Sequence, residues 1–305
     1  MPVTETGGIP GARFLDPATL ARIDNLELLA RTVVEGFLNG LHNSPYLGLS
    51  VDFAEHRPYM PGDDIRRIDW RLWARTDRHY IKEFEADTNA NFSVILDVSR
   101  SMSYGSGPIT KLDYAKYLAA CLAWFARKQR DRVGLVTFDS DIVDRVRPSA
   151  KNLNVVLHTL DRLKPGTRGS LREPLLKIAE TFQRRSILAL ISDFYEDPKA
   201  VVDAVNLLRA KGNDLIVFQV LDPAELEFPF PAPANFEDLE SGERIPIVPD
   251  NFRDRYRELI SAHVADLEKR FGENRVDYAL FQTSTPLDYG LFHFLSRRQR
   301  LSRVR

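Results

Sequence analysis

Short apolar runs alternate with amphipathic segments along most of the chain from residue 92 onward. The apolar runs are rich in β-branched residues, and they cover residues 92–98, 132–139, 186–193 and 214–221. Such continuous runs are typical of strands that are buried on both faces, as parallel strands are. The segments between them have helical spacing of their apolar residues. This alternation predicts an α/β fold: a doubly wound, mostly parallel sheet with helices on both faces.

The rest of the chain after residue 92 is expected to add two strands to this sheet, the helices between the strands, and one irregular insertion. Residues 142–146 are expected to form a short edge strand, and residues 276–282 a last strand before a helix capped by Thr285-Pro286. Helices are expected at residues 111–129, 153–163, 171–182, 198–211 and 252–271. Six of the 18 prolines lie between Asp222 and Asp250. This composition predicts an irregular insertion that contains a β-hairpin around Ser241-Gly242.

Residues 1–90 differ from the rest and are expected to form a smaller helical and irregular module before a main domain at 91–305. Asp16-Pro17 is a typical helix start, with one or two helices continuing to about Gly40. The stretch from Leu47 to Asp87 contains Trp70 and Trp73 among alternating charges. The favoured interpretation is structural, with ion pairs and tryptophan stacking fixing this module to the main domain. A docking surface is the alternative.

Composition and charge restrict the function classes. The 305 residues are 44% hydrophobic and 28% charged, and the formal net charge is −1. A near-neutral chain has no overall field that would draw it to nucleic acid, so no nucleic-acid partner is expected. The single cysteine, Cys121, cannot form an internal disulfide. The apolar runs are too short for a transmembrane segment, and the amino-terminus lacks a signal pattern. These features lead us to expect a cytoplasmic protein.

Candidate chemistry gathers where the first and later strands end. Asp97 ends the run 92–98 and is followed by Ser99 and Ser101, while Asp193 ends the run 186–193. If the strand order is 3-2-1-4-5-6, these two strands are neighbours at the switch point where open α/β sheets bind ligands. Thr167 lies in a glycine-rich loop expected over the same place. Carboxylates and hydroxyls are hard oxygen ligands, which suit Mg²⁺ or Mn²⁺ better than zinc.

These residues resemble a known family. Asp-x-Ser-x-Ser at 97–101, a later Gly166-Thr167 and a strand-ending Asp193 are similar to the metal-ion-dependent adhesion site of von Willebrand factor A domains. The segment Gly48–Asp97, with Arg-Pro-Tyr-Met-Pro-Gly-Asp-Asp-Ile-Arg-Arg-Ile-Asp-Trp, resembles the region before that domain in a bacterial family of unknown function. Members of that family are encoded with MoxR-type AAA+ ATPases. The sequence departs from the usual pattern at Pro165 and Phe194, where glycine is common.

The resemblance implies a non-enzymatic protein-binding module. Ser99, Ser101 and Thr167 would contact the metal through hydroxyls, and Asp97 and Asp193 directly or through water. Two carboxylates and three neutral hydroxyls leave a divalent cation able to accept an Asp or Glu from a partner. A MoxR-type AAA+ ATPase is the partner that the resemblance suggests, in assembly or chaperone-like work.

Two other interpretations are open. A metal-dependent phosphoester hydrolase is the alternative function, although hydrolysis would need a positioned base or nucleophile near the ion. The two aspartates could also serve only to cap the turns that follow their strands. A phosphate-binding loop at 105–111 is excluded because Thr110 stands where glycine is required. The arginine-rich carboxyl-terminus, residues 297–305, is expected to be solvated.

Overall fold

The computed structural model describes residues 17–20, 22–23, 25–42, 55–60, 70–83, 90–167, 169–182, 186–239, 242–289 and 291. Its centre is a six-stranded sheet with the order β10-β7-β6-β3-β4-β5. The strands are β3 (Asn91–Asp97), β4 (Arg132–Phe138), β5 (Ile142–Ser149), β6 (Ser186–Ser192), β7 (Asp214–Leu221) and β10 (Asp277–Gln282). All neighbours are parallel except β5, which pairs antiparallel with β4 at the edge. Numbered along the chain, this is the order 3-2-1-4-5-6 on which the adjacency of the two aspartates depends. The predicted fold class is confirmed.

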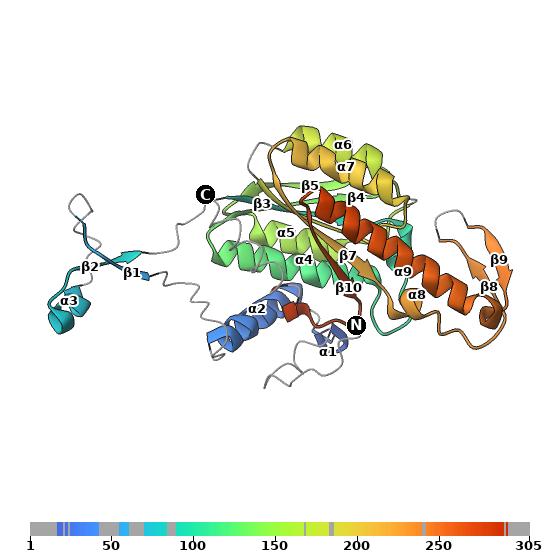
Figure 1. Ribbon diagram of the computed structural model, residues 1–305, viewed down its shortest axis with the longest axis horizontal. Helices are drawn as coiled ribbons and strands as arrows, with labels where there is room; N and C mark the ends of the chain where they lie inside the picture. The colour runs from blue at the N-terminus through green and yellow to red at the C-terminus, as the bar shows by residue number, and fades with distance from the viewer. Residues whose placement is uncertain are drawn as a thin grey trace.

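Helices cover both faces of this sheet (Figure 1). One layer contains α2, α4 and α5, and the other contains α6, α7 and α9. Their bounds are α2 (Leu26–His42), α4 (Lys111–Lys128), α5 (Leu153–Arg162), α6 (Arg172–Thr181), α7 (Pro198–Ala210) and α9 (Pro249–Glu273). Along β3, Val94 and Leu96 belong to one core and Ile95 to the other. Because alternate side chains point to opposite faces, a strand covered on both sides must be apolar throughout.

Local sequence signals set the starts of several helices. At α4 the Thr110 hydroxyl accepts a hydrogen bond from the backbone N–H of Asp113, and the Asp113 carboxylate accepts one from the backbone of Thr110. At α7 the Asp197 carboxylate accepts from the backbone N–H of Ala200, with proline at the first helical position. These caps satisfy amide groups that have no partner inside a helix. Both helices begin where the sequence predicts.

The amino-terminal helices join the core beneath the sheet. Helix α1 (Pro17–Leu20) is short, and α2 packs against α4. Leu29 and Val33 of α2 are fully buried in the same cluster as the apolar side chains of α4. The expected helices before Gly40 are therefore present, and α2 packs on α4 and α5, the helices that cover one face of the main sheet. The domain boundary expected near residue 90 stays a prediction.

The tryptophan-containing segment forms a small unit of its own. Strands β1 (Glu55–Pro58) and β2 (Tyr80–Glu83) pair antiparallel, with α3 (Trp70–Thr76) between them in the chain. The ring of His79 stacks on Trp73 at 5.8 Å, and Trp70 meets Trp73 edge-on at 6.1 Å. The aromatic rings therefore pack on one another inside this unit, and the interpretation that they fix the module to the main domain stays a prediction. Residues 61–69, which hold many of the expected ion pairs, lie outside the described residues.

The predicted insertion after β7 begins with a short helix, α8 (Pro223–Glu227), and continues into a hairpin of β8 (Ala234–Glu237) and β9 (Arg244–Ile247). The hairpin lies beside the first turns of α9 (Figure 1). Beyond β10 the chain is helical at residues 287–289 and 291, and the rest of the predicted last helix, with the terminal arginines, lies outside the described residues. Among the helices of the described ranges, none has the length and apolar character needed to cross a membrane.

Candidate metal centre

The candidate site lies at the carboxyl edge of the sheet, where β3 and β6 run side by side. Asp97 is the last residue of β3, and Asp193 directly follows β6. The two strands pair in parallel from Asn91 with Ser186 to Leu96 with Ile191. The adjacency that the sequence suggested for these two aspartates is therefore present. Both side chains are buried, with 5% and 3% of their surface exposed.

The first part of the site is built locally, within Asp97-x-Ser-x-Ser. One carboxylate oxygen of Asp97, Oδ1, accepts a hydrogen bond from the backbone N–H of Ser99 at 2.8 Å. The hydroxyl oxygens of Ser99 and Ser101 lie 3.1 Å apart. The other oxygen of Asp97, Oδ2, accepts from the hydroxyl of Ser192 at 2.6 Å. One residue separates each of these positions from the next, and the turn brings the side chains of Asp97, Ser99 and Ser101 together.

The glycine-rich loop lies directly against this turn. The backbone N–H of Gly166 donates to the carbonyl of Val98 at 2.6 Å, and the N–H of Arg100 donates to the carbonyl of Thr167 at 3.0 Å. A Cβ atom at Gly166 would lie 2.7 Å from Oδ2 of Asp139 and 3.1 Å from the carbonyl of Val98. Glycine is therefore required for this approach. The loop crosses the serine turn as the sequence predicted.

The side chain of Thr167 is held by a residue from the end of β4. Its hydroxyl donates to Oδ2 of Asp139 at 2.8 Å, and its backbone N–H donates to the same oxygen at 3.0 Å. Burial raises the pKa of Asp139, but hydrogen bonds from Thr167 and neighbouring backbone groups outweigh it and leave the pKa below its usual value. Asp139 is thus an ionised acceptor, and the lone pairs of the Thr167 oxygen are left to face another group.

Asp193 is held by a buried lysine. The Lys111 ammonium lies 2.8 Å from Oδ2 of Asp193 and 2.7 Å from Oε1 of Glu225. It also lies 4.9 Å from the ring centre of Tyr195. The side chain of Lys111 is fully buried. Burial lowers its pKa, but Asp193 and Glu225 together raise it above its usual value, so the ammonium stays charged.

Phe194, the residue after Asp193, has a backbone conformation that usually requires glycine. Its φ is 54°, which lies in the left-handed region. Its ring is fully buried and meets Phe271 edge-on at 6.3 Å. His263 of α9 lies 3.0 Å from its carbonyl. Burial of the ring offsets the strained backbone, which explains why phenylalanine stands at this position.

The electrostatics of the site are those of two carboxylates in a confined place. The pKa of Asp97 is raised to about 7, first by burial and then by the negative charge of Asp193. Hydrogen bonds from Ser192 and Ser99 act in the opposite direction. A cation between the two carboxylates would remove their repulsion.

The donor set fits a hard cation. Asp97, Ser99 and Ser101 lie together, and the loop that carries Thr167 crosses them. The hydroxyl of Thr167 binds Asp139. One carboxylate oxygen of Asp193 binds Lys111. In the part of the chain that the structure describes, no cluster of three or more His, Cys, Asp or Glu side chains is placed to hold a metal. Any ion here would therefore depend on the hydroxyls, which suits Mg²⁺ or Mn²⁺ and not zinc. The metal-ligand roles of these five residues stay a prediction.

Four residues of the site escaped the sequence reasoning: Lys111, Asp139, Ser192 and Glu225. Ser192 directly precedes Asp193 at the end of a buried strand, and a hydroxyl at this position could have been predicted to face the site. Asp139 follows β4 at the start of a turn, and its carboxylate accepts a hydrogen bond from the backbone N–H of Asp141 at 3.1 Å. Lys111 and Glu225 lie 114 residues apart in sequence, and no spacing pattern connects them.

The sequence of the chain is similar to a known protein family and to several curated proteins. Residues 55–266 match the family described as "Protein of unknown function DUF58". The chain belongs to this family. Uncharacterized proteins of Mycobacterium bovis and Mycobacterium tuberculosis are each 28% identical over 265 residues, which cover 83% of this chain and 81% of theirs.

Solved structures with a similar arrangement have low sequence identity. The conserved hypothetical protein BatB from Bacteroides thetaiotaomicron is 15% identical with a TM-score of 0.47, and the match covers 69% of this chain and 99% of that one. The VWA domain of SpRpn10 is 12% identical with a TM-score of 0.38, covering 65% of this chain and 92% of that one.

Proposed function

We propose that this protein is a non-enzymatic, Mg²⁺-dependent (or Mn²⁺-dependent) protein-binding module that captures an Asp or Glu of a partner protein. The observation that supports it is the meeting of three loops over β3 and β6. They gather carboxylates and hydroxyls from Asp97, Ser99, Ser101, Thr167 and Asp193 at one edge of the sheet. Two carboxylates neutralise a divalent cation, and neutral hydroxyls add no further charge. The cation can therefore take one more carboxylate from outside.

The residues of this chain would each have a defined part in holding the ion. Asp97 would supply negative charge while its hydrogen bonds from Ser99 and Ser192 fix its orientation. Thr167 would offer its lone pairs, since its hydrogen points to Asp139. Asp193 binds Lys111 through Oδ2, so its Oδ1 is the oxygen that would turn toward the ion.

A binding role agrees better with the environment of Asp97 than hydrolysis does. The residue is buried, and each of its two oxygens accepts a hydrogen bond. Such a carboxylate is held in place and is poorly suited to act as a nucleophile or as a mobile base. A phosphoester hydrolase would need another group for that step. Hydrolysis is therefore the second candidate.

The partner follows from the resemblance of residues 48–97 to a family encoded with MoxR-type AAA+ ATPases. We infer that such an ATPase is the partner or delivers the partner, in assembly or chaperone-like work. The acidic residue that completes the metal's coordination would then belong to the ATPase or to its client.

The test is a pull-down from a lysate of the source organism, performed with Mg²⁺ and with a chelator, using the wild type and Asp97→Ala. A partner captured only by the wild type and only with Mg²⁺ is the expected result. Asp203→Ala, which removes an exposed carboxylate on α7, serves as the control and should behave as the wild type. Capture that persists with the chelator would refute the metal-dependent mechanism. Release of phosphate from model esters by the wild type, lost in Asp97→Ala, would favour the hydrolase.

A further inference from the structure

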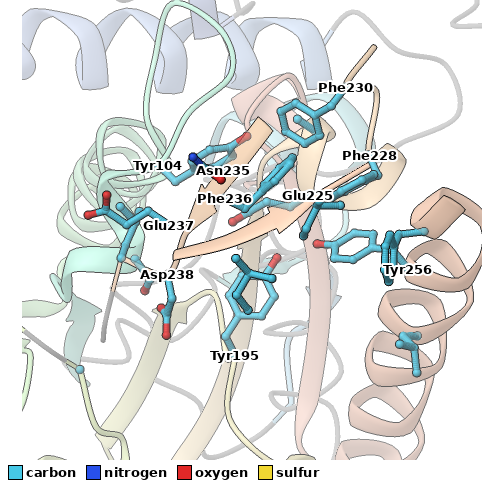
Figure 2. Close-up of a pocket in the computed structure, with 18 of the residues that line it drawn as sticks. Tyr104, Tyr195, Glu225, Phe228, Phe230, Asn235, Phe236, Glu237, Asp238 and Tyr256 are labelled. Atoms are coloured by element: carbon cyan, nitrogen blue, oxygen red, sulfur yellow. The ribbon is translucent and has the colours of Figure 1, made fainter. Parts of the chain in front are cut away.

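A large cavity extends from the candidate metal centre to the inserted hairpin. Its volume is about 1300 Å³, and Ser101 and Thr167 line one end of it. The opposite wall comes from α8, the hairpin of β8 and β9, and the first half of α9. Figure 2 shows the aromatic side chains of this wall facing the cavity. Pockets for small ligands usually measure 300–1000 Å³, so this space suits a segment of polypeptide better.

The wall formed by the insertion is firmly attached. The ring of Phe228 packs against Phe236 of β8 at 5.3 Å and against Tyr256 of α9 at 4.7 Å. The Arg253 guanidinium donates to the carbonyls of Phe228 and Phe230. The segment before the hairpin is thus fixed to α9 by aromatic packing and by hydrogen bonds, and Phe236 of β8 packs on that segment. The cavity has a defined shape on this side.

Several large apolar side chains in the lining of the cavity are exposed. Tyr195, Ile245, Phe252 and Leu259 all line the cavity, and each has 43–54% of its surface exposed. Exposed apolar residues that gather in one place and are rimmed by polar groups mark interaction sites. The hydroxyls of Tyr195 and Tyr256 form a hydrogen bond beside Glu225, so the floor combines aromatic rings with a carboxylate (Figure 2).

The charge of the lining selects the kind of side chain that fits. Four carboxylates of the described residues line the cavity, from Glu196, Glu225, Glu237 and Asp238. Lys111 pairs with Glu225 at 2.7 Å and Arg244 pairs with Glu237 at 2.8 Å, so part of this negative charge is already balanced. Among the described residues that line the cavity, Arg255 is the single cationic side chain, and it pairs with Glu258 at 3.1 Å. A second acidic group of a partner would be repelled here. An Arg or Lys would place its apolar stem on the aromatic rings and its charge near the carboxylates.

We propose that this cavity, which we call the hairpin groove, binds the partner segment next to its metal-binding residue. The segment carries an Asp or Glu for the ion and, a few residues away, an Arg or Lys seated among the aromatic residues of the groove. This proposal rests on the proposed function above, and it adds a second specificity element supplied by the insertion. The ion binds the acidic side chain of the segment and the groove binds its cationic side chain, so an acidic peptide without Arg or Lys binds weakly.

The experiment uses a phage-displayed peptide library with a fixed central Asp and randomised flanks, selected on the full chain in Mg²⁺. Recovered peptides should be enriched in Arg or Lys together with large apolar residues on one side of the Asp. The affinity of the best synthetic peptide should fall at least tenfold in Phe252→Ser, because exposed aromatic anchors carry much of the binding energy at interfaces. Asp238→Lys should weaken the same peptide and reduce the preference for cations.

Matched controls separate the two proposals. Leu28→Ser removes an equally exposed apolar residue on α2, outside the groove, and should bind the peptide as the wild type does. Phe252→Ser should keep the rise in melting temperature caused by Mg²⁺ alone. If Mg²⁺ stabilises the wild type but the peptides lack a cation, or bind Phe252→Ser equally well, the groove proposal is wrong while the metal site stands. If Mg²⁺ does not stabilise the wild type at all, both proposals are wrong.

Discussion

The two halves of the candidate metal centre are held in different ways. Asp97, Ser99 and Ser101 are joined to one another by hydrogen bonds between residues two apart in sequence, and Ser192 adds one long-range hydrogen bond to Asp97. Thr167 and Asp193 are each fixed by a charged residue from elsewhere, Asp139 in one case and Lys111 in the other. The first half is a local motif, and the second half depends on the packing of the whole domain.

This difference indicates how the site can respond to a cation. The local half presents its oxygens in a fixed arrangement. In the other half, Asp193 already has a cation beside it, the Lys111 ammonium, which balances its charge when no metal is bound. The same lysine contacts Glu225 in the wall of the hairpin groove. We therefore expect substitutions in the second half to affect both folding and metal binding.

The largest expected effect comes from Lys111→Met. This change leaves Asp193 and Glu225 without their buried cation, and breaking a buried ion pair on one side costs about 3–5 kcal/mol. Chemical denaturation without metal should show this loss in the free energy of unfolding. Mg²⁺ should then stabilise the variant more than the wild type, because the ion supplies a positive charge beside Asp193.

The matched control is Lys116→Met on the same helix, which removes a half-buried lysine whose ammonium donates to the carbonyl of Leu163 at 2.7 Å. A hydrogen bond from a charged donor to a backbone carbonyl is worth about 1.5–3 kcal/mol, so the loss in Lys116→Met should be smaller than the loss in Lys111→Met. Equal losses in the two variants would show that Lys111 has no special part in holding Asp193.

The next effect concerns the ion itself. Mg²⁺ at 100 times its dissociation constant should stabilise the wild type by about 2.7 kcal/mol, since a ligand that binds only the folded state adds to its stability. Differential scanning calorimetry should show the corresponding rise in melting temperature, and it should be absent in Asp97→Ala and Thr167→Ala. The control Asp203→Ala should respond as the wild type does. Equal rises in all of these proteins would place the ion elsewhere.

A smaller effect is expected from Asp139→Asn. Asp139 orients the Thr167 hydroxyl without contacting the ion, and removal of such supporting groups typically weakens metal binding by about 10–100-fold. Isothermal titration with Mg²⁺ measures this directly. Asp141→Asn is the matched control, because Asp141 is an exposed carboxylate two residues away that pairs with Lys177 at 2.8 Å. An unchanged affinity in Asp139→Asn would show that Thr167 needs no orientation.

The smallest effect on Mg²⁺ affinity comes from pH. Asp97, with a pKa of about 7, must lose its proton to bind a cation, so Mg²⁺ affinity should fall about fivefold between pH 7 and pH 6. The pKa also lies above the ordinary value of 3.8. The folded, metal-free protein therefore keeps a proton that the unfolded chain releases. This contribution to stability is complete below about pH 4 and is lost as pH rises toward 7. Denaturation across this range should show the loss in the wild type but not in Asp97→Asn.

Much of the fold followed from the sequence alone. The apolar runs identified the strands, and the caps at Thr110 and Asp197 identified helix starts, because these signals act between residues close in the chain. The order of the strands entered the sequence analysis only as a condition, the common order of sheets of this class, and the structure has that order. The local half of the site, Asp97 to Ser101, was visible for the same reason.

Tertiary structure alone decided what holds the other half. Lys111 meets Asp193 across 82 residues and Glu225 across 114, and Asp139 meets Thr167 across 28. A buried charge needs its partner because desolvation is costly, but the sequence does not state which partner the packing will bring. The hairpin groove is likewise a product of packing, because its walls come from loops, a hairpin and a helix that only the folded chain places around one space.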